Sequence, residues 1–210
     1  MDGLLVDSEV RALRAWREVG KRYGITDIDE LFPKMIGMNT HTRGLLFAER
    51  YGSNFPFSEC NEEVRSLAHG YEAESPIPLK KGVRELLSYL RKNGYRMAIA
   101  SSGLMATIER RMKYHGIFEY FDVIVSGDMV TKSKPDPEIF LLCAERLGVP
   151  PAEITVLEDS QNGIKAAHAA GMRPVMVPDI AAPEKEVAAL AYTVCSSLFE
   201  VKEKYESGSL

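Results

Sequence analysis

From Gly82 onward, short apolar runs alternate with segments that have the period of a helix. The apolar runs have the length of strands and cover residues 95–100, 123–125, 154–157 and 174–177, with a weaker run around Val194. The helical segments cover residues 83–92, 104–115, a stretch that ends at 147, and 163–170. Strands and helices that alternate in this way form a parallel sheet with right-handed crossover connections. The alternation therefore predicts an α/β fold whose core is a Rossmann-like parallel sheet.

Residues 8–78 show a different pattern, because they have helical periodicity and no convincing strand. The first helix of this segment is expected to place four apolar side chains on one face, namely Val10, Leu13, Trp16 and Val19. Further helices are expected at residues 43–51 and 58–71. A helical block inside an α/β fold predicts an inserted all-helical cap domain. We therefore expect a core of residues 1–7 and 79–210, a cap of residues 8–78, and Trp16 in the interior of the cap.

The composition limits the partners that the protein can have. Its 26 Lys and Arg against 30 Asp and Glu give a net charge of −4, which argues against a surface that follows nucleic acid. No apolar run approaches the ~20 residues of a membrane-spanning helix, and acids stand at the start where a signal peptide needs positive charge. The cysteines Cys60, Cys143 and Cys195 are scattered singly, a pattern that supports neither a disulfide framework nor a zinc site. We expect a cytoplasmic protein that binds neither nucleic acid nor membranes. The sequence does not determine its oligomeric state, for which a monomer is favoured.

Polar side chains follow several of the apolar runs. Ligands of an open α/β sheet bind beyond the carboxyl ends of its strands, so these side chains are the candidate site residues. They are Asp2, Ser101, Ser102, Lys134, Glu158 and Asp159. Carboxylates that converge with a lysine and a hydroxyl can hold a hard cation and the oxygens of a phosphoryl group. Each piece alone has an ordinary explanation, since a Glu-Asp pair after a strand is common at a helix N-terminus. Their common position at strand ends favours a site.

Four segments of the chain resemble the haloacid dehalogenase superfamily, specifically the phosphatases and phosphomutases that carry a helical cap after the first strand. The segments are residues 1–9 (MDGLLVDSE), 99–102 (IASS), 132–137 (KSKPDP) and 156–163 (VLEDSQNG). They span nearly the whole chain and follow the order and spacing of that family. The resemblance implies a small phosphorylated metabolite as the substrate class and Mg²⁺ as the cofactor.

The resemblance also implies a role for each candidate in catalysis. In such enzymes an aspartate attacks phosphorus and forms an aspartyl-phosphate, and a second aspartate two residues later protonates the leaving oxygen and then activates water. Asp2 matches that second aspartate. Ser101, with Ser102 beside it, and Lys134 match the groups that bind the transferring phosphoryl group. Lys134 also offsets negative charge between the nucleophile and the substrate.

Glu158 and Asp159 match the acidic pair that holds Mg²⁺ in this family, together with the backbone carbonyl of Asp2 and the carboxylate of the nucleophile. The metal neutralises charge and aligns the reactants, because otherwise an anionic carboxylate would attack an anionic phosphate. The resemblance therefore places the metal at Asp2, Glu158 and Asp159.

The family's nucleophile belongs two residues before Asp2, immediately upstream of Met1. The apolar strand that carries it lies in the middle of the family's sheet, and the loss of a central strand could cost the total stability of a domain. We therefore expect Met1 to be the internal methionine of a Phe-Asp-Met-Asp-Gly motif, with the true start roughly ten residues earlier. An in-frame apolar run that ends in Asp upstream of Met1 would confirm this expectation.

Three functions follow from these residues. The leading hypothesis is a Mg²⁺-dependent phosphatase of small phosphorylated metabolites, with sugar phosphates among them. A β-phosphoglucomutase-like mutase is the alternative, but the chain has Ala12, Ile36 and Thr40 where such mutases carry a histidine, a lysine and an arginine, and only Arg43 could substitute. Dehalogenation is disfavoured, because it does not need the Asp2 carboxylate. The remaining alternative is a catalytically inactive phosphate-binding module.

Overall fold

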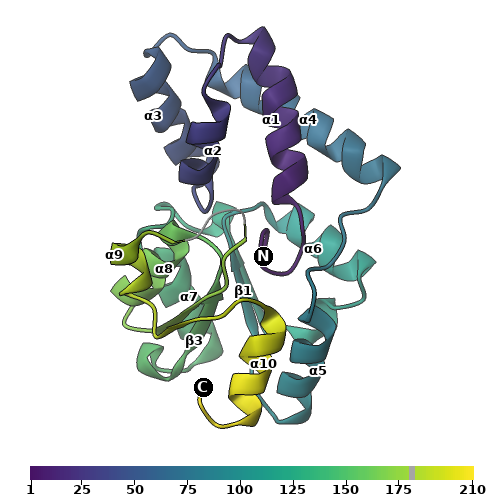
Figure 1. The fold of residues 1–210 in the computed structure, drawn as a ribbon, viewed down its shortest axis with the longest axis vertical. Coiled ribbons are helices and arrows are strands. Elements are labelled where there is room, and N and C mark those ends of the chain that lie inside the picture. Colours follow the sequence, from purple (N-terminus) through teal and green to yellow (C-terminus); the bar gives the residue numbers. More distant parts are fainter. Residues whose placement is uncertain (180–182) are drawn as a thin grey trace.

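The computed structural model describes residues 1–179 and 183–210. A group of four helices stands over one end of an α/β body, and the N-terminus lies between the two (Figure 1). The helices of the upper group are α1 (Glu9–Arg22), α2 (Ile28–Met35), α3 (Thr40–Tyr51) and α4 (Phe57–Glu74). The strands of the body are β1 (Ala98–Ser101), β2 (Val123–Ser126), β3 (Thr155–Glu158), β4 (Arg173–Met176) and β5 (Thr193–Val194). Its α-helices are α5 (Val83–Lys92), α6 (Met105–Tyr114), α7 (Glu138–Leu147), α8 (Gln161–Ala169), α9 (Lys185–Ala188) and α10 (Leu198–Glu206). Short 3₁₀ turns complete it at η1 (Phe118–Tyr120), η2 (Gly127–Met129) and η3 (Pro151–Glu153).

Helices α1 to α4 enclose an apolar interior of their own. Trp16 lies in it, 2% exposed, and its ring stacks on that of Phe47 with the centroids 5.2 Å apart. Helix α1 presents Trp16 and Val19 to this interior because their spacing puts both on one face. Val10, which the sequence pattern placed on the same face, is 63% exposed instead, because it lies about two and a half turns before Val19 and therefore on the opposite side of α1. The division at residues 8 and 78 stays a prediction.

Two segments of the chain connect the helical group to the body, and they lie side by side. The first crossing is the segment that leads into α1, and the second crossing is the segment between α4 and α5. Val6 forms an antiparallel bridge with Leu79, and the Asp7 N–H donates to the carbonyl of Pro78 over 3.0 Å. The guanidinium of Arg11 fastens α1 to the second crossing by donating to the Pro76 carbonyl at 3.2 Å. The paired crossings hold the lower end of α1 directly above the ends of the strands.

The strands are parallel, as the sequence predicts, but they form two ladders rather than one. One ladder pairs β1 with β2, and the other has the order β3-β4-β5. An apolar cavity of about 190 Å³ separates β1 from β3. Met1, Leu5, Ile99, Phe140 and Leu157 are among its lining residues. The expectation of a single sheet is therefore met only in part, because in the described residues no strand lies between β1 and β3 to join the ladders.

Most predicted elements are present with shifted ends. The strand expected at 95–100 begins at Ala98, because residues 95–97 lead into it without ladder pairing. Three helices were not predicted, namely α2, which is short and contains Pro33, the four-residue α9, and α10. Helix α10 packs on α5 at the base of the body and buries Leu198 and Val201, a single pair of apolar positions that gives a weak periodic signal (Figure 1).

The structure also shows the state of the three cysteines and the character of the helices. The cysteines are all free and buried, so no disulfide joins them. Among the described residues, every helix is too short or too polar to cross a bilayer.

Candidate active site

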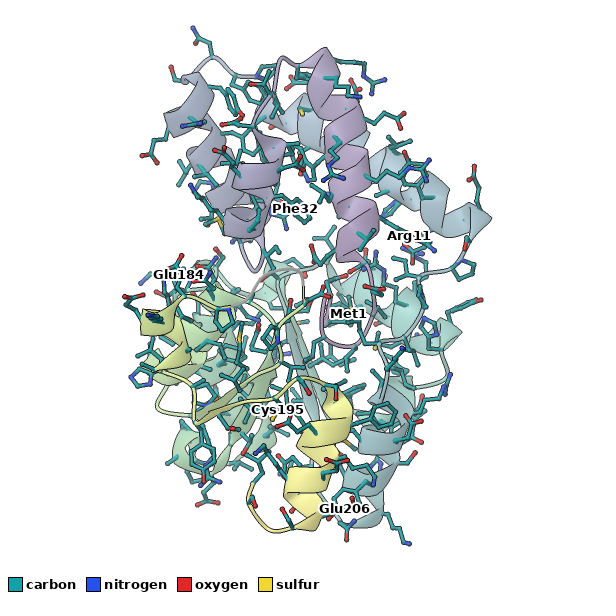
Figure 2. All side chains as sticks on the ribbon, viewed as in Figure 1. Met1, Arg11, Phe32, Glu184, Cys195 and Glu206 are labelled. Carbon is teal, nitrogen blue, oxygen red and sulfur yellow. The ribbon has the colours of Figure 1, made fainter. Side chains whose placement is uncertain are left out.

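A cavity of about 190 Å³ lies where the carboxyl ends of β1 and β3 meet the underside of the helical group. It brings all six predicted site residues together, namely Asp2, Ser101, Ser102, Lys134, Glu158 and Asp159. Phe32 and Arg11 line it from the helical side and Met1 from the body, and all three lie at the junction of the two parts (Figure 2). Residues that are far apart in the sequence therefore share one enclosed space.

A buried ion pair forms the floor of this cavity. The Lys134 ammonium contacts Oε1 of Glu158, and their side chains are only 4% and 7% exposed. Lys134 also donates to the carbonyl of Ala100 over 3.3 Å, while Oε2 of Glu158 accepts from the backbone N–H and the hydroxyl of Ser160. Although burial opposes ionisation, Lys134 holds the pKa of Glu158 below its usual value. Both carboxylate oxygens of Glu158 are thus engaged by the protein.

The two serines differ in their surroundings. Ser101 ends β1, is 3% exposed, and its Oγ accepts from the backbone N–H of Gly103 at 3.2 Å. The Ser102 hydroxyl instead donates to the carbonyl of Gly37 in the loop between α2 and α3, at 2.7 Å. The proton of the Ser102 hydroxyl is therefore used in the contact with the loop. The Ser101 hydroxyl only accepts a hydrogen bond, so it can still donate to a phosphoryl oxygen.

The loop between α2 and α3 closes over the strand ends through several contacts. The side-chain amide of Asn162 donates to the carbonyl of Ile36 at 2.9 Å, and the hydroxyls of Thr42 and Ser133 are 2.7 Å apart. Gly37 has a φ of +81°, and a Cβ at this position would lie 2.9 Å from the Ser160 hydroxyl. A side chain there would both strain the backbone and push the loop away, so the close approach depends on glycine.

Asp2 is held from both parts of the molecule. Its Oδ1 accepts from the Ser8 hydroxyl at 2.6 Å and forms an ion pair with Arg111 of α6. Arg111 also pairs with Glu72 of α4 at 3.1 Å, and the two side chains are 13% and 8% exposed. Although burial works to raise it, Arg111 and Ser8 hold the pKa of Asp2 below its usual value. Sequence patterns did not indicate Arg111 or Glu72, because neither follows a strand. Arg111 reaches Asp2, and Glu72 reaches Arg111, only through tertiary packing.

Two further acidic side chains, Asp159 and Glu9, also line the cavity. Burial and the neighbouring Glu158 raise the pKa of Asp159 to about 7. Burial, with the charges of Asp2 and Asp159, raises the pKa of Glu9 on α1 to about 8, although Arg43 works in the opposite direction. A cation bound here would favour the ionised form of both carboxyl groups.

The donors fit Mg²⁺ in type and charge. Buried carboxylates such as that of Asp159 are oxygen ligands of the kind Mg²⁺ prefers, and their ionisation here is opposed by burial until a cation is present. Within the described ranges, no three Asp, Glu, His or Cys side chains gather closely enough to hold a metal by themselves. A magnesium site would therefore use oxygens other than side-chain carboxylates as well, and the backbone carbonyl of Asp2 is the donor that the family resemblance implies.

The chain has similar proteins among those already known. The chain matches the model of the family described as haloacid dehalogenase-like hydrolase over residues 1–177. It is 34% identical over 207 residues to hexitol phosphatase B of Escherichia coli strain K12, covering 97% of this chain and 92% of that protein. It is 33% identical over 180 residues to the phosphorylated carbohydrates phosphatase of Thermotoga maritima, covering 83% and 81%. The crystal structure of β-phosphoglucomutase from Clostridium difficile has a TM-score of 0.79 at 23% identity, covering 99% and 95%, and confirms the α/β fold.

The substitution Lys134→Met tests the buried ion pair. Removal of one partner leaves the Glu158 charge buried and unpaired, so we expect a loss of about 3–5 kcal/mol in the free energy of unfolding, measured by chemical denaturation at neutral pH. The double variant with Glu158→Gln should recover most of the loss. Lys113→Met, which removes the exposed pair with Glu109, is the matched control and should cost less than about 1 kcal/mol. A loss in Lys134→Met as small as in the control would contradict the account.

The substitution Glu9→Gln tests the charge balance of the cavity. The pKa of Glu9 is raised from its usual 4.5 to about 8 in the folded protein, so its contribution to stability is complete below pH 4.5 and is lost as pH rises toward 8. The unfolding free energy of the unmodified chain should therefore fall more steeply between about pH 5 and 8 than that of Glu9→Gln. Denaturation titrations across this range measure both slopes, with Glu30→Gln on the surface of α2 as the control. Equal slopes in the chain and in Glu9→Gln would refute the assignment.

Proposed function

The chain belongs to the haloacid dehalogenase-like hydrolase family, and from that premise we propose that it is a Mg²⁺-dependent phosphatase of small phosphorylated metabolites, with sugar or sugar-alcohol monophosphates as substrates. The observation that carries this proposal is the convergence of Asp2, Ser101, Lys134 and Asp159 in one cavity under the helical cap. These residues supply an acid/base group, two donors for phosphoryl oxygens and an oxygen ligand for a cation. Hexitol phosphatase B and the phosphorylated carbohydrates phosphatase support the choice of substrate class.

Each group in the cavity would have a distinct task in the reaction. The Ser101 hydroxyl and the Lys134 ammonium would bind and orient the phosphoryl oxygens. The Asp2 carboxyl would give a proton to the leaving alcohol and later take one from the attacking water. Glu158 and Asp159, with the Asp2 carbonyl, would hold Mg²⁺, which supplies charge neutralisation around the phosphoryl group. The Glu158 carboxylate contacts Lys134 in this structure, so it would also hold that lysine in place.

The nucleophile is the group that this set of residues still needs. We propose that an aspartate immediately upstream of Met1 fills this role and forms the aspartyl-phosphate. The cavity between β1 and β3 supports the proposal, because it is lined by apolar side chains and faces the unpaired edges of both strands. An apolar strand inserted there would pair with β1 and β3 and would deliver its last residue to the active site.

The helical side of the cavity favours a neutral, hydroxylated leaving group. Glu9 and Arg43 both line it, and Trp16 and Phe32 add apolar surface. The Glu9 carboxyl group can form hydrogen bonds with hydroxyls and supplies no positive charge for a second phosphate, while the Arg43 guanidinium already donates to the Met38 carbonyl. This arrangement suits a polyol monophosphate better than a bisphosphate, and it therefore favours hydrolysis over the phosphomutase reaction.

The activity can be tested by comparing the 210-residue chain with a version extended upstream through the proposed strand and aspartate. We expect the extended chain to hydrolyse hexitol phosphates in the presence of Mg²⁺, and the 210-residue chain to bind phosphate without turnover. Asp2→Asn in the extended chain should lower kcat by about 10²–10⁴-fold, the contribution of a general acid/base. Asp29→Asn on the cap surface is the matched control and should leave turnover unchanged.

Three outcomes would contradict parts of this account. Equal turnover by the short and extended chains would overturn the assignment of the nucleophile. Unchanged kcat in Asp2→Asn would remove Asp2 from the reaction. Phosphate binding without turnover by either chain, across a panel of phosphorylated metabolites, would favour the inactive phosphate-binding module.

A further inference from the structure

Asp179 is a buried carboxylate to which the catalytic scheme gives no task. It follows β4 by three residues, and its side chain is 10% exposed. Its Oδ1 forms an ion pair with Lys80, next to the second crossing between cap and body. Among the residues that the structure describes, nothing hydrogen-bonds to its Oδ2, which is also shielded from solvent. A buried carboxylate oxygen without a partner costs stability, so its retention calls for an explanation.

The unpartnered oxygen points toward the acidic end of the active site. A Cβ placed on Gly3 would lie 2.2 Å from Oδ2 of Asp159 and 3.2 Å from Oδ2 of Asp179, so the two carboxylates converge on the same face of Gly3. Gly3 has a φ of +71° and no side chain, and this allows both oxygens to approach. The backbone holds this end of β4 against β3, because the Val177 N–H donates to the Glu158 carbonyl at 2.7 Å. The convergence is therefore a property of the strand ends.

The side-chain cations near this part of the cavity each pair with a carboxylate. The N-terminal ammonium of Met1 also favours the ionised form of Asp159, but a chain extended upstream would have a peptide bond in its place. Lys80 contacts Oδ1 of Asp179 and lies 3.4 Å from Asp7, so it serves two carboxylates. Arg111 and Lys134 pair with Asp2 and Glu158. A divalent cation is the simplest species that would offset the remaining negative charge.

We propose that Asp179 is a further acidic residue of the Mg²⁺ site, where its Oδ2 strengthens binding of the cation at Asp159 by its charge and by accepting a hydrogen bond from a metal-bound water. This inference rests on the proposed function, since it assumes that Asp159 binds the metal. Asp179 is a positioning residue in this role, and Lys80 keeps its carboxylate turned toward Gly3. Partners of this kind outside the direct ligands change metal affinity by about 10–100-fold.

Calorimetric titration of Mg²⁺ tests the inference without an activity assay. The unmodified chain in this test is the one extended upstream through the proposed strand and aspartate, because that aspartate is itself an expected ligand of the metal. Asp179→Asn keeps the oxygen that accepts from Lys80 and replaces only the charged Oδ2, and it should weaken Mg²⁺ binding about 10-fold or more. Asp7→Asn is the matched control, because Asp7 also faces Lys80, and its Mg²⁺ affinity should equal that of the unmodified chain.

Thermal unfolding of the same variants provides the check on folding and a second measurement. The rise in Tm that Mg²⁺ produces should be smaller in Asp179→Asn than in the unmodified chain and in Asp7→Asn. If Asp159→Asn loses Mg²⁺ binding while Asp179→Asn keeps it within twofold, the proposal for Asp179 is overturned and the proposed function stands. If the unmodified chain binds no Mg²⁺, both the metal site and the role of Asp179 are overturned.

Discussion

The Lys134 ammonium joins the two halves of the body at the floor of the candidate active site. It contacts Glu158 at the end of β3 and donates to the Ala100 carbonyl in β1, so one buried cation spans the gap between two separate ladders. A charge this deeply buried is tolerated only with close partners, and these partners fix the relative positions of the strand ends. Ser101 and Asp159 take their places from those ends. The geometry of the phosphoryl site therefore depends on this ion pair.

The cap completes a site that the body supplies only in part. Glu9 and Arg43 come from α1 and α3, and Glu72 of α4 reaches Arg111, which in turn contacts Asp2. These contacts place opposite charges close together in a partly buried space, where electrostatic interactions are stronger than in water. A cap that moved away would change the surroundings of Asp2 and would open the cavity. Binding of substrate and closure of the cap should accordingly be coupled.

The sequence predicted those features that local pattern determines. Apolar runs and helical periodicity located the strands and most of the helices, and the residues that follow the strands identified the six side chains that share the cavity. Arg111, Glu9 and Asp179 were missed for a different reason. Arg111 and Glu9 lie inside helices, where charged residues are common and carry no special signal. Asp179 lies three residues after the end of β4, so it does not directly follow a strand as the predicted site residues do. Their importance comes from three-dimensional packing around Asp2 and Gly3, which no spacing rule reveals. The division of the strands into two ladders could not be predicted either. The apolar pattern of a strand does not show whether a neighbouring strand is present to pair with it.

The central claim is that this cavity binds a phosphoryl group and Mg²⁺ together. Its most direct test is a calorimetric titration of inorganic phosphate into the chain extended upstream through the proposed strand and aspartate, performed with and without Mg²⁺. The account predicts saturable binding at one site per chain, with a lower Kd when Mg²⁺ is present, because the cation offsets the repulsion between phosphate and the buried carboxylates. An absence of phosphate binding, or a Kd that is the same with and without Mg²⁺, would contradict it.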